Sequence, residues 1–328
     1  MRPRAIYESP LRIDRYINNN FLDKCVMIKI GNYTNEGLEM KVTSLILILS
    51  LVVLCFSGCG GTVETADIAA TTLPVYQFTA MLVEGTGLTV TRLVTESVSC
   101  LHDYSLNVRQ VKAAEAAELI VINGAGLEDF MADILRNKQT VDASAGIELE
   151  DDCHEHDHDD HHHHADNHIW LSPETAMVMA RNIHAGLSTA YPQHRDLLET
   201  NMHKLLQQLQ QLLDYGRQQL AQLSSRELVT FHDGFGHFAH CFDLHILAAV
   251  EEEAGAETSA HKLIELIGLV QQHHIPAIFV ETNGSDSSAK VICAETGAAL
   301  YTLDMAMAGE DYFAAMYHNI DTIREALA

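Results

Sequence analysis

The chain has 328 residues, of which 47% are hydrophobic, and it carries a formal net charge of −25 at pH 7. The length suits two domains of ordinary size, and the hydrophobic content supports packed cores, so a chain that is disordered throughout is excluded. The strong negative charge argues against nucleic acid as a partner, because phosphate binding requires a basic surface, and it makes cations the natural ligands.

A targeting signal lies near the N-terminus. Lys41 precedes an apolar run over residues 45–56, and Ser57, Gly58 and Cys59 follow it. A basic residue, a short apolar stretch and small residues before a cleavage point are typical of a secretory signal. The run is shorter than the roughly 20 apolar residues that span a bilayer. An uncleaved anchor is the alternative, and in either case the rest of the chain is exported.

The tetrapeptide FSGC at residues 56–59 resembles a bacterial lipobox, with Phe56 where leucine is usual. We therefore expect a lipoprotein signal peptide at residues 40–58 and a lipidated Cys59. The lipid would anchor the protein to the outer face of the cytoplasmic membrane, in the periplasm or at the cell surface. Residues 1–39, with four arginines near their start, do not fit an export segment. We interpret them as a non-native extension ahead of a start at Met40.

Strand-like and helix-like segments alternate after the signal. Residues 67–71 and 88–94 are expected strands around a helix that Pro74 opens. Residues 119–122, LIVI, form a further short strand, and the turn at 123–126 leads into another helix. This βαβ rhythm predicts a parallel sheet with helices on both faces.

Residues 151–165 form the most distinctive segment. It mixes acidic residues with seven histidines, which are His154, His156, His158, His161, His162, His163 and His164. Neutral imidazole is a common zinc ligand, and the carboxylates raise the local cation concentration. Such a run does not pack in a core, so we expect a solvated loop that gathers metal, with Cys153 as an additional soft ligand. A loop that is merely acidic and soluble is the alternative.

A helix should open at Ser172, a suitable N-cap, with Pro173 in its first turn. Residues 193–223 then contain no proline and repeat leucines at helical spacing. A helix of that length is roughly 45 Å long, which suits a strut between two domains, although an ordinary core helix is the alternative. The rhythm resumes with a C-terminal helix and strands at 228–231, 246–250, 277–281 and 298–303.

Two cysteines of the second half, Cys241 and Cys293, form either a disulfide or two buried free thiols, because connectivity is not readable from sequence.

Four candidate metal ligands share one structural context. His102 follows the strand at 88–94, and His168 lies shortly after the histidine-rich segment. His232 ends the strand at 228–231, and Asp304 follows the last strand. In open α/β sheets ligands bind at the carboxyl ends of the strands. Three imidazoles and one carboxylate suit a tetrahedral zinc site.

The chain resembles the metal-specific substrate-binding lipoproteins of bacterial ABC importers, the ZnuA/TroA group. The resemblance covers residues 66–328. It is carried by His102-Asp103-Tyr104, AAELIVINGAGLEDFM, the histidine-rich segment, HIWLSPETA, TFHDGFGHF and LYTLDMAMAGEDYFAAMYHNIDTI. It implies two α/β lobes, each with a mainly parallel sheet, joined by one long rigid helix. The implied lobes are residues 59–190 and 225–328, with the linking helix at 191–224. The implied ligands are the same four residues.

Several positions depart from the pattern of that group. Leu101 stands where proline or glutamate usually precedes the first histidine, and Asn167 and Met305 replace usual prolines. Since Met305 directly follows Asp304, Glu281 is the alternative fourth ligand. His237 replaces a usual aromatic residue and is expected to lie near the ligands or in solvent.

The predicted function is therefore the capture of zinc outside the cell membrane, by a monomer, for delivery to an ABC permease, without catalysis. A third imidazole favours zinc over manganese, which prefers oxygen donors. Binding of manganese or another divalent metal, or an adhesin role, is the alternative. A zinc hydrolase is disfavoured because a fourth protein ligand closes the site and the chain has no HExxH motif.

Overall fold

The computed structural model describes residues 66–96, 101, 104–149, 166–232, 234–251, 258–282, 284–307 and 309–328. All of them belong to one compact unit, Val63–Ala328. The expected extension, signal peptide and lipidated Cys59 lie outside the described residues, as do His102 and the histidine-rich segment. Among the described residues, no helix combines the length and the apolar character needed to cross a membrane.

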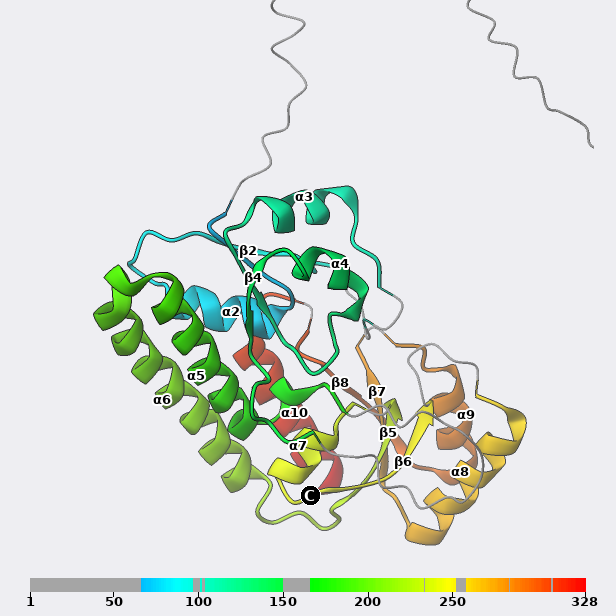
Figure 1. Ribbon diagram of the computed structural model, residues 1–328. Helices are drawn as coiled ribbons and strands as arrows, with labels where there is room; N and C mark the ends of the chain where they lie inside the picture. The colour runs from blue at the N-terminus through cyan, green and yellow to red at the C-terminus, as the bar shows by residue number, and fades with distance from the viewer. Residues whose placement is uncertain are drawn as a thin grey trace, which may run out of the picture. The chain divides into compact units, whose positions relative to one another are not determined.

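The first half folds into a four-stranded parallel sheet with the strand order β2-β1-β3-β4 (Figure 1). Its central strands are buried, as expected for a sheet covered on both faces. A proline in the first turn of α2 and a capping box at Asn107 before α3 fix where these helices begin. The bounds are β1 (Ile68–Ala70), α2 (Leu73–Leu82), β2 (Val90–Arg92), α3 (Val108–Ala116), β3 (Leu119–Ile122), η1 (Asp129–Met131), α4 (Ala132–Leu135) and β4 (Gln139–Asp142).

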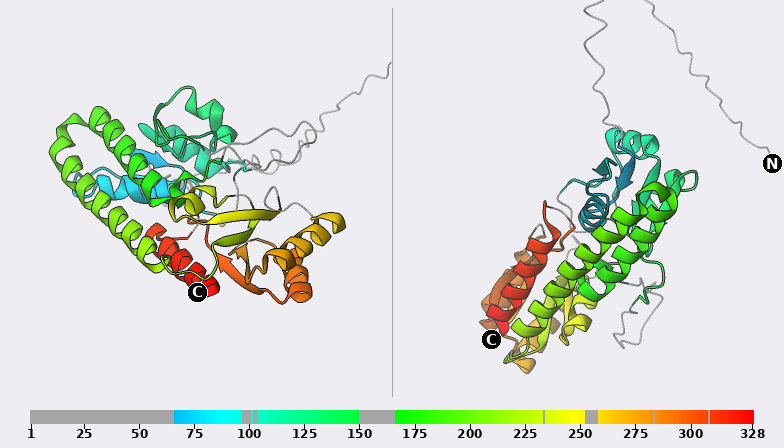
Figure 2. Two further views of the ribbon diagram at one scale, coloured as in Figure 1. Left: turned by 90° about the horizontal axis from the view of Figure 1, so that it is seen from below. Right: turned by 90° about the vertical axis from the view of Figure 1, so that its left-hand side faces the viewer.

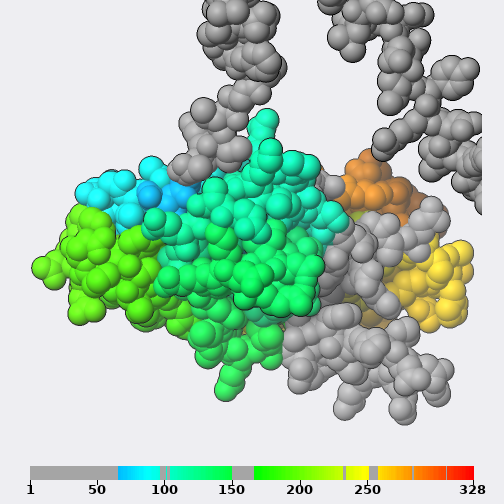
Figure 3. All heavy atoms as spheres, turned by 45° about the horizontal axis from the view of Figure 1, so that its top comes forward, coloured from blue at the N-terminus to red at the C-terminus, as the bar shows by residue number. Residues whose placement is uncertain are grey.

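The second half forms another four-stranded parallel sheet, in the order β6-β5-β7-β8. Its elements are β5 (Glu227–His232), α7 (Gly236–Cys241), β6 (His245–Glu251), α8 (Ala260–His273), β7 (Ala277–Glu281), α9 (Ser287–Thr296), β8 (Ala299–Leu303) and α10 (Tyr312–Leu327). In the face shown in Figure 3, the atoms of residues 104–149 lie between those of α5 and α6 on one side and those of α8 on the other.

Helices α5 (Pro173–Ala190) and α6 (Arg195–Gln219) connect the two sheets, after η2 (Ile169–Leu171) and with η3 (Pro192–His194) between them. The 25-residue α6 is about 37 Å long and packs against α5, against α2 of the first lobe and against α10 of the second (Figure 2). Gly216 lets the Phe242 ring pack directly on the backbone of α6, because a Cβ at this position would lie 2.3 Å from that ring. The predicted two-lobe α/β fold with a long connecting helix is thus confirmed.

The sequence-based bounds of most strands differ from the observed ones by one or two residues, and two differences are larger. The long helix ends at Gln219 rather than near residue 223. Directly after this end, the Arg226 guanidinium donates to the carbonyl of Leu220, and the chain turns toward β5. Strand β4 was not expected, because QTVD is an edge strand with only Val141 buried and therefore lacks an apolar run. The cap at Ser172, which accepts hydrogen bonds from the N–H groups of Glu174 and Thr175, is confirmed.

Candidate metal centre

Three of the candidate side chains belong to the carboxyl ends of adjacent parallel strands in the second sheet. His232 is the last residue of β5, Glu281 is the last residue of β7, and Asp304 directly follows β8. Glu281 pairs in register with Leu303, so β7 and β8 end side by side. Only the backbone of His232 is described. Glu281 is buried at 5% exposure, at the end of the strand next to β8.

Asp304 is held by its own turn and by helix α10. Its N–H donates to Oδ1 of Asn319 at 2.8 Å, and Asn319 Nδ2 donates back to the Asp304 carbonyl at 2.7 Å. The N–H of Ala306, a buried residue with a φ of 53°, donates to Asp304 Oδ1 at 2.8 Å. This turn uses one carboxylate oxygen, so the second oxygen is the one that a cation would contact. Asn319, fully buried, was not identified from the sequence.

His168 is a buried imidazole with a defined tautomer. Its N–H and its Nδ1 lie 2.9 and 2.8 Å from Oδ1 of Asp166. A carboxylate only accepts hydrogen bonds, so Nδ1 carries a proton and donates it to Asp166, the kind of partner that a metal-binding imidazole usually has. Burial acts to raise the pKa of Asp166, but the hydrogen bonds from His168 and the electrostatic interactions with the His168 and His237 rings lower it to about 2. Asp166 is therefore ionised at neutral pH.

The segment before His168 is attached to the carboxyl edge of the first sheet. Asn123, which follows β3, donates from Nδ2 to the Asn167 carbonyl at 3.1 Å. Glu128 organises this edge, because its carboxylate accepts from Thr71 Oγ1 at 2.6 Å, Asn123 N at 2.8 Å and Gly124 N at 3.0 Å. Burial nevertheless raises the pKa of Glu128 to about 7. The contact of Glu128 with Thr71 is not readable from the sequence, because the two residues are 57 positions apart.

The carboxyl edges of the two sheets are joined directly by hydrogen bonds. Trp170 Nε1 donates to the Met305 carbonyl at 2.7 Å, and the Tyr312 hydroxyl donates to the Trp170 carbonyl at 2.7 Å. The Leu73 N–H, at the start of α2, donates to the Met307 carbonyl at 3.3 Å. The segments that carry His168 and Asp304 are therefore neighbours. Met305, which stands where a proline is usual, contributes its carbonyl and a buried side chain to this junction.

The remaining candidates are His237 and the two cysteines Cys241 and Cys293. His237 is buried, and its Nε2 lies 3.0 Å from the Asp166 carbonyl, so that nitrogen is not a metal ligand. Cys241 and Cys293 are free thiols rather than a disulfide, and burial raises the pKa of Cys241 to about 11, which keeps it protonated. Among the described residues, no three side chains of histidine, cysteine, aspartate or glutamate converge to hold a metal ion.

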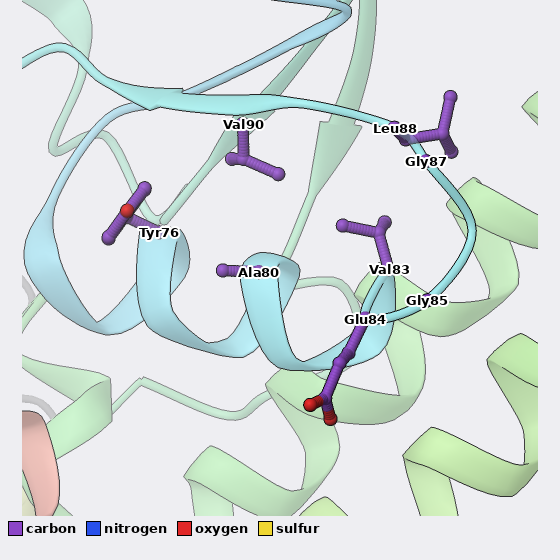
Figure 4. Close-up of a pocket in the computed structure, with 8 residues that line it drawn as sticks. All are labelled: Tyr76, Ala80, Val83, Glu84, Gly85, Gly87, Leu88 and Val90. Atoms are coloured by element: carbon purple, nitrogen blue, oxygen red, sulfur yellow. The ribbon is translucent and has the colours of Figure 1, made fainter.

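A surface groove lies elsewhere on the first lobe (Figure 4). Residues of α2 and of the loop leading to β2 line it, from Tyr76 and Ala80 to Leu88 and Val90, with Glu84 pointing away at its lower end. None of the candidate ligands contributes to the groove, so it is not the metal centre.

Two parallel α/β sheets connected through a long helix, with a carboxylate-bound histidine and an aspartate at their joined edges, are the arrangement expected of a substrate-binding protein for metal ions. The chain belongs to the family described as ZnuA, zinc-uptake complex component A, periplasmic, whose model matches residues 68–326. This family consists of metal-binding transport proteins and not of enzymes, which confirms that prediction. Members work outside the cytoplasm with ABC permeases.

Individual relatives agree with this assignment. A protein of Treponema pallidum (strain Nichols) whose name refers to metal binding is 29% identical over 308 residues, which cover 88% of this chain and 97% of that protein. The zinc-binding lipoprotein AdcA of Streptococcus pneumoniae (strain ATCC BAA-255 / R6) is 28% identical over 308 residues. That match covers 87% of this chain but 61% of AdcA, so the chain spans about three fifths of that relative.

Solved structures give the same result for the fold. The crystal structure of ZnuA is 28% identical, with a TM-score of 0.70, and the match covers 81% of this chain and 100% of ZnuA. A manganese-bound periplasmic metal-binding protein from Candidatus Liberibacter asiaticus has the same fold at 20% identity and a TM-score of 0.70, covering 80% of this chain and 100% of its own.

Proposed function

We propose that the protein captures one zinc ion tightly outside the cytoplasmic membrane and delivers it to an ABC permease. The proposed ligands are His102, His168, His232 and Asp304. The observation that carries the proposal is the buried His168, whose Nδ1 is bound by ionised Asp166 while its segment contacts that of Asp304. A carboxylate behind an imidazole raises its basicity and fixes its orientation, which is the usual arrangement around a protein-bound zinc ion.

We further propose how the protein is attached to the membrane and how zinc reaches the tight site. The protein would act as a monomer, held at the membrane by lipid on Cys59. The histidine-rich residues 151–165 would bind further zinc ions weakly and raise their concentration near the tight site. The similarity to a zinc-binding lipoprotein supports this proposal.

The experiment is the metal content and zinc affinity of the purified chain and its variants. His102→Ala, His168→Ala and His232→Ala should each weaken tight zinc binding by orders of magnitude while the fold survives. Asp304→Ala should have a smaller effect, because Glu281 or water can replace one oxygen donor. His318→Ala, an exposed position on α10, is the control. Wild-type affinity in all three histidine variants would refute the site.

Manganese is the second candidate cargo. The buried Glu281 at the end of β7 would supply a second carboxylate beside Asp304, and oxygen donors favour manganese. Competition between the two metals at pH 7 distinguishes the candidates, since a preference for manganese over zinc would contradict a site with three imidazoles. Glu281→Ala should leave zinc affinity nearly unchanged if Asp304 is the fourth ligand.

A further inference from the structure

His237 is a buried polar residue with one well-defined partner. It lies in α7, five residues after His232, and is 3% exposed. Its Nε2 lies 3.0 Å from the carbonyl oxygen of Asp166. A carbonyl only accepts hydrogen bonds, so Nε2 carries a proton and donates it to this bond. His237 therefore binds the backbone of a residue that belongs to the opposite lobe.

The acceptor residue is the one that orients His168. Asp166 receives the His237 bond on its carbonyl and the two bonds from His168 on its carboxylate. The main chain of Asp166 is thus held from the second lobe, while its side chain fixes the tautomer of a proposed ligand in the first lobe. Helix α7 also packs against η2, which begins directly after His168. A shift of α7 would displace Asp166, and the imidazole bound to it would move as well.

We propose that His237 is a positioning residue that couples the orientation of His168 to the lobe carrying His232. This inference rests on the proposed function and adds a means by which the two lobes act on one site. His232 ends β5, and His237 lies in α7 directly after it. Separation of the lobes would therefore withdraw the ligand His232 directly and would free the ligand His168 by displacing Asp166. A bound metal ion would lose both imidazoles together.

The test compares zinc affinity and zinc release for the full chain and two variants at one position. His237→Phe retains a ring but has no donor, and we expect its zinc affinity to fall and its release rate to rise by about 2- to 10-fold, the range for one buried hydrogen bond. His237→Gln should stay within about twofold of wild type, because its amide can donate to the same carbonyl. His318→Phe, at an exposed position of α10, is the matched control.

A second comparison covers the case in which His237→Phe folds poorly. Asp166→Asn keeps the carbonyl but removes the charge behind His168, and it should weaken zinc binding about 10- to 100-fold. If His237 acts through Asp166, the loss in a double variant is smaller than the product of the two single losses. In the metal-free protein, ring carbon and nitrogen NMR shifts of His168 should report the Nδ1–H tautomer in wild type and its loss in Asp166→Ala.

The outcomes separate this inference from the proposed function. Wild-type affinity in His237→Phe, equal losses in His237→Phe and His237→Gln, or losses that multiply in the double variant would each overturn the role of His237. If the unaltered chain binds no zinc, or if His168→Ala binds zinc as wild type does, the proposed function fails instead. The His168 tautomer is measured without metal and therefore tests the Asp166 contact independently of the cargo.

Discussion

Replacing Glu128 by glutamine should flatten the pH dependence of folding stability. Glu128 is 3% exposed and accepts three hydrogen bonds, from Thr71, Asn123 and Gly124. Burial raises its pKa from 4.5 to about 7, the nearby charge of Asp142 acts in the same direction, and the three donors act against both. The carboxyl group therefore keeps a proton in the folded protein over a pH range in which the unfolded chain has lost it.

The sign of the effect follows from this difference. Between about pH 4.5 and pH 7 the folded state binds more protons than the unfolded state, so stability falls as the pH rises through that window. A pKa raised from 4.5 to about 7 corresponds to about 3 kcal/mol, present in full below pH 4.5 and lost above pH 7. Glutamine does not ionise, but its amide N–H₂ would face the Gly124 N–H and cannot accept a hydrogen bond from it. The Gly124 N–H would then have no acceptor, which lowers the folding stability by about 1–3 kcal/mol at every pH.

We therefore expect wild type to be more stable than Glu128→Gln by about 1–3 kcal/mol near pH 5, and the two proteins to become similar, or to reverse in order, by pH 8. Urea unfolding of the metal-free protein, with a chelator present, measures this difference at each pH. Other titrating groups are common to both proteins and cancel. Glu115→Gln, at an exposed position of α3, is the control. A difference that stays constant from pH 5 to pH 8 would refute the raised pKa.

Three further predictions address metal binding and packing. Deleting residues 151–165 should remove weak, multiple zinc binding and leave one tight site, because His168 lies outside the deletion; loss of all binding in a titration would mean that the loop is the site. Zinc release on acidification should occur in two steps, first from the loop near pH 6.5 and then steeply from the tight site, since protons compete for several imidazoles; a single shallow step in a zinc titration would contradict this. Gly216→Ala should destabilise the fold by about 1–3 kcal/mol in urea unfolding, because its Cβ would lie 2.3 Å from Phe242. Gly268→Ala, in α8 with no atom within 4 Å of the added Cβ, should instead be neutral or stabilising by up to about 1 kcal/mol.

The strands that sequence predicts best are those with continuous apolar runs. LIVI at β3 and AIFVE at β7 were predicted with their observed bounds, because strands buried on both faces need apolar residues at every position. The edge strand β4 has only one buried residue and gives no such pattern. The cap at Ser172 was predictable because an N-cap acts within three residues of itself.

The candidate site divides in the same way between local and distant contacts. The placement of Glu281 and Asp304 at strand ends follows from the strand pattern. Asp166 was within reach of sequence reasoning, since a carboxylate two residues before a candidate histidine can bind its ring. Asn319 was not, because it meets Asp304 across 15 residues, and the partner of His237 was not, because Asp166 is 71 residues away. The first pair forms when α10 packs against β8 within the second lobe, and the second pair forms only when the two lobes pack together.

The hydrogen bonds between the lobes affect how a cargo could leave. Four of them involve buried groups, namely those from Trp170 to Met305, Tyr312 to Trp170, Leu73 to Met307 and His237 to Asp166. At about 1 kcal/mol each they favour the joined lobes by about 4 kcal/mol, which is about a thousandfold in population, before any metal contributes. The metal-free chain should therefore keep its lobes together. A permease that takes zinc from this protein must then offset both the bonds between zinc and its ligands and the four hydrogen bonds between the lobes. A partner that displaced α7 would weaken the zinc bonds and the hydrogen bonds between the lobes at once.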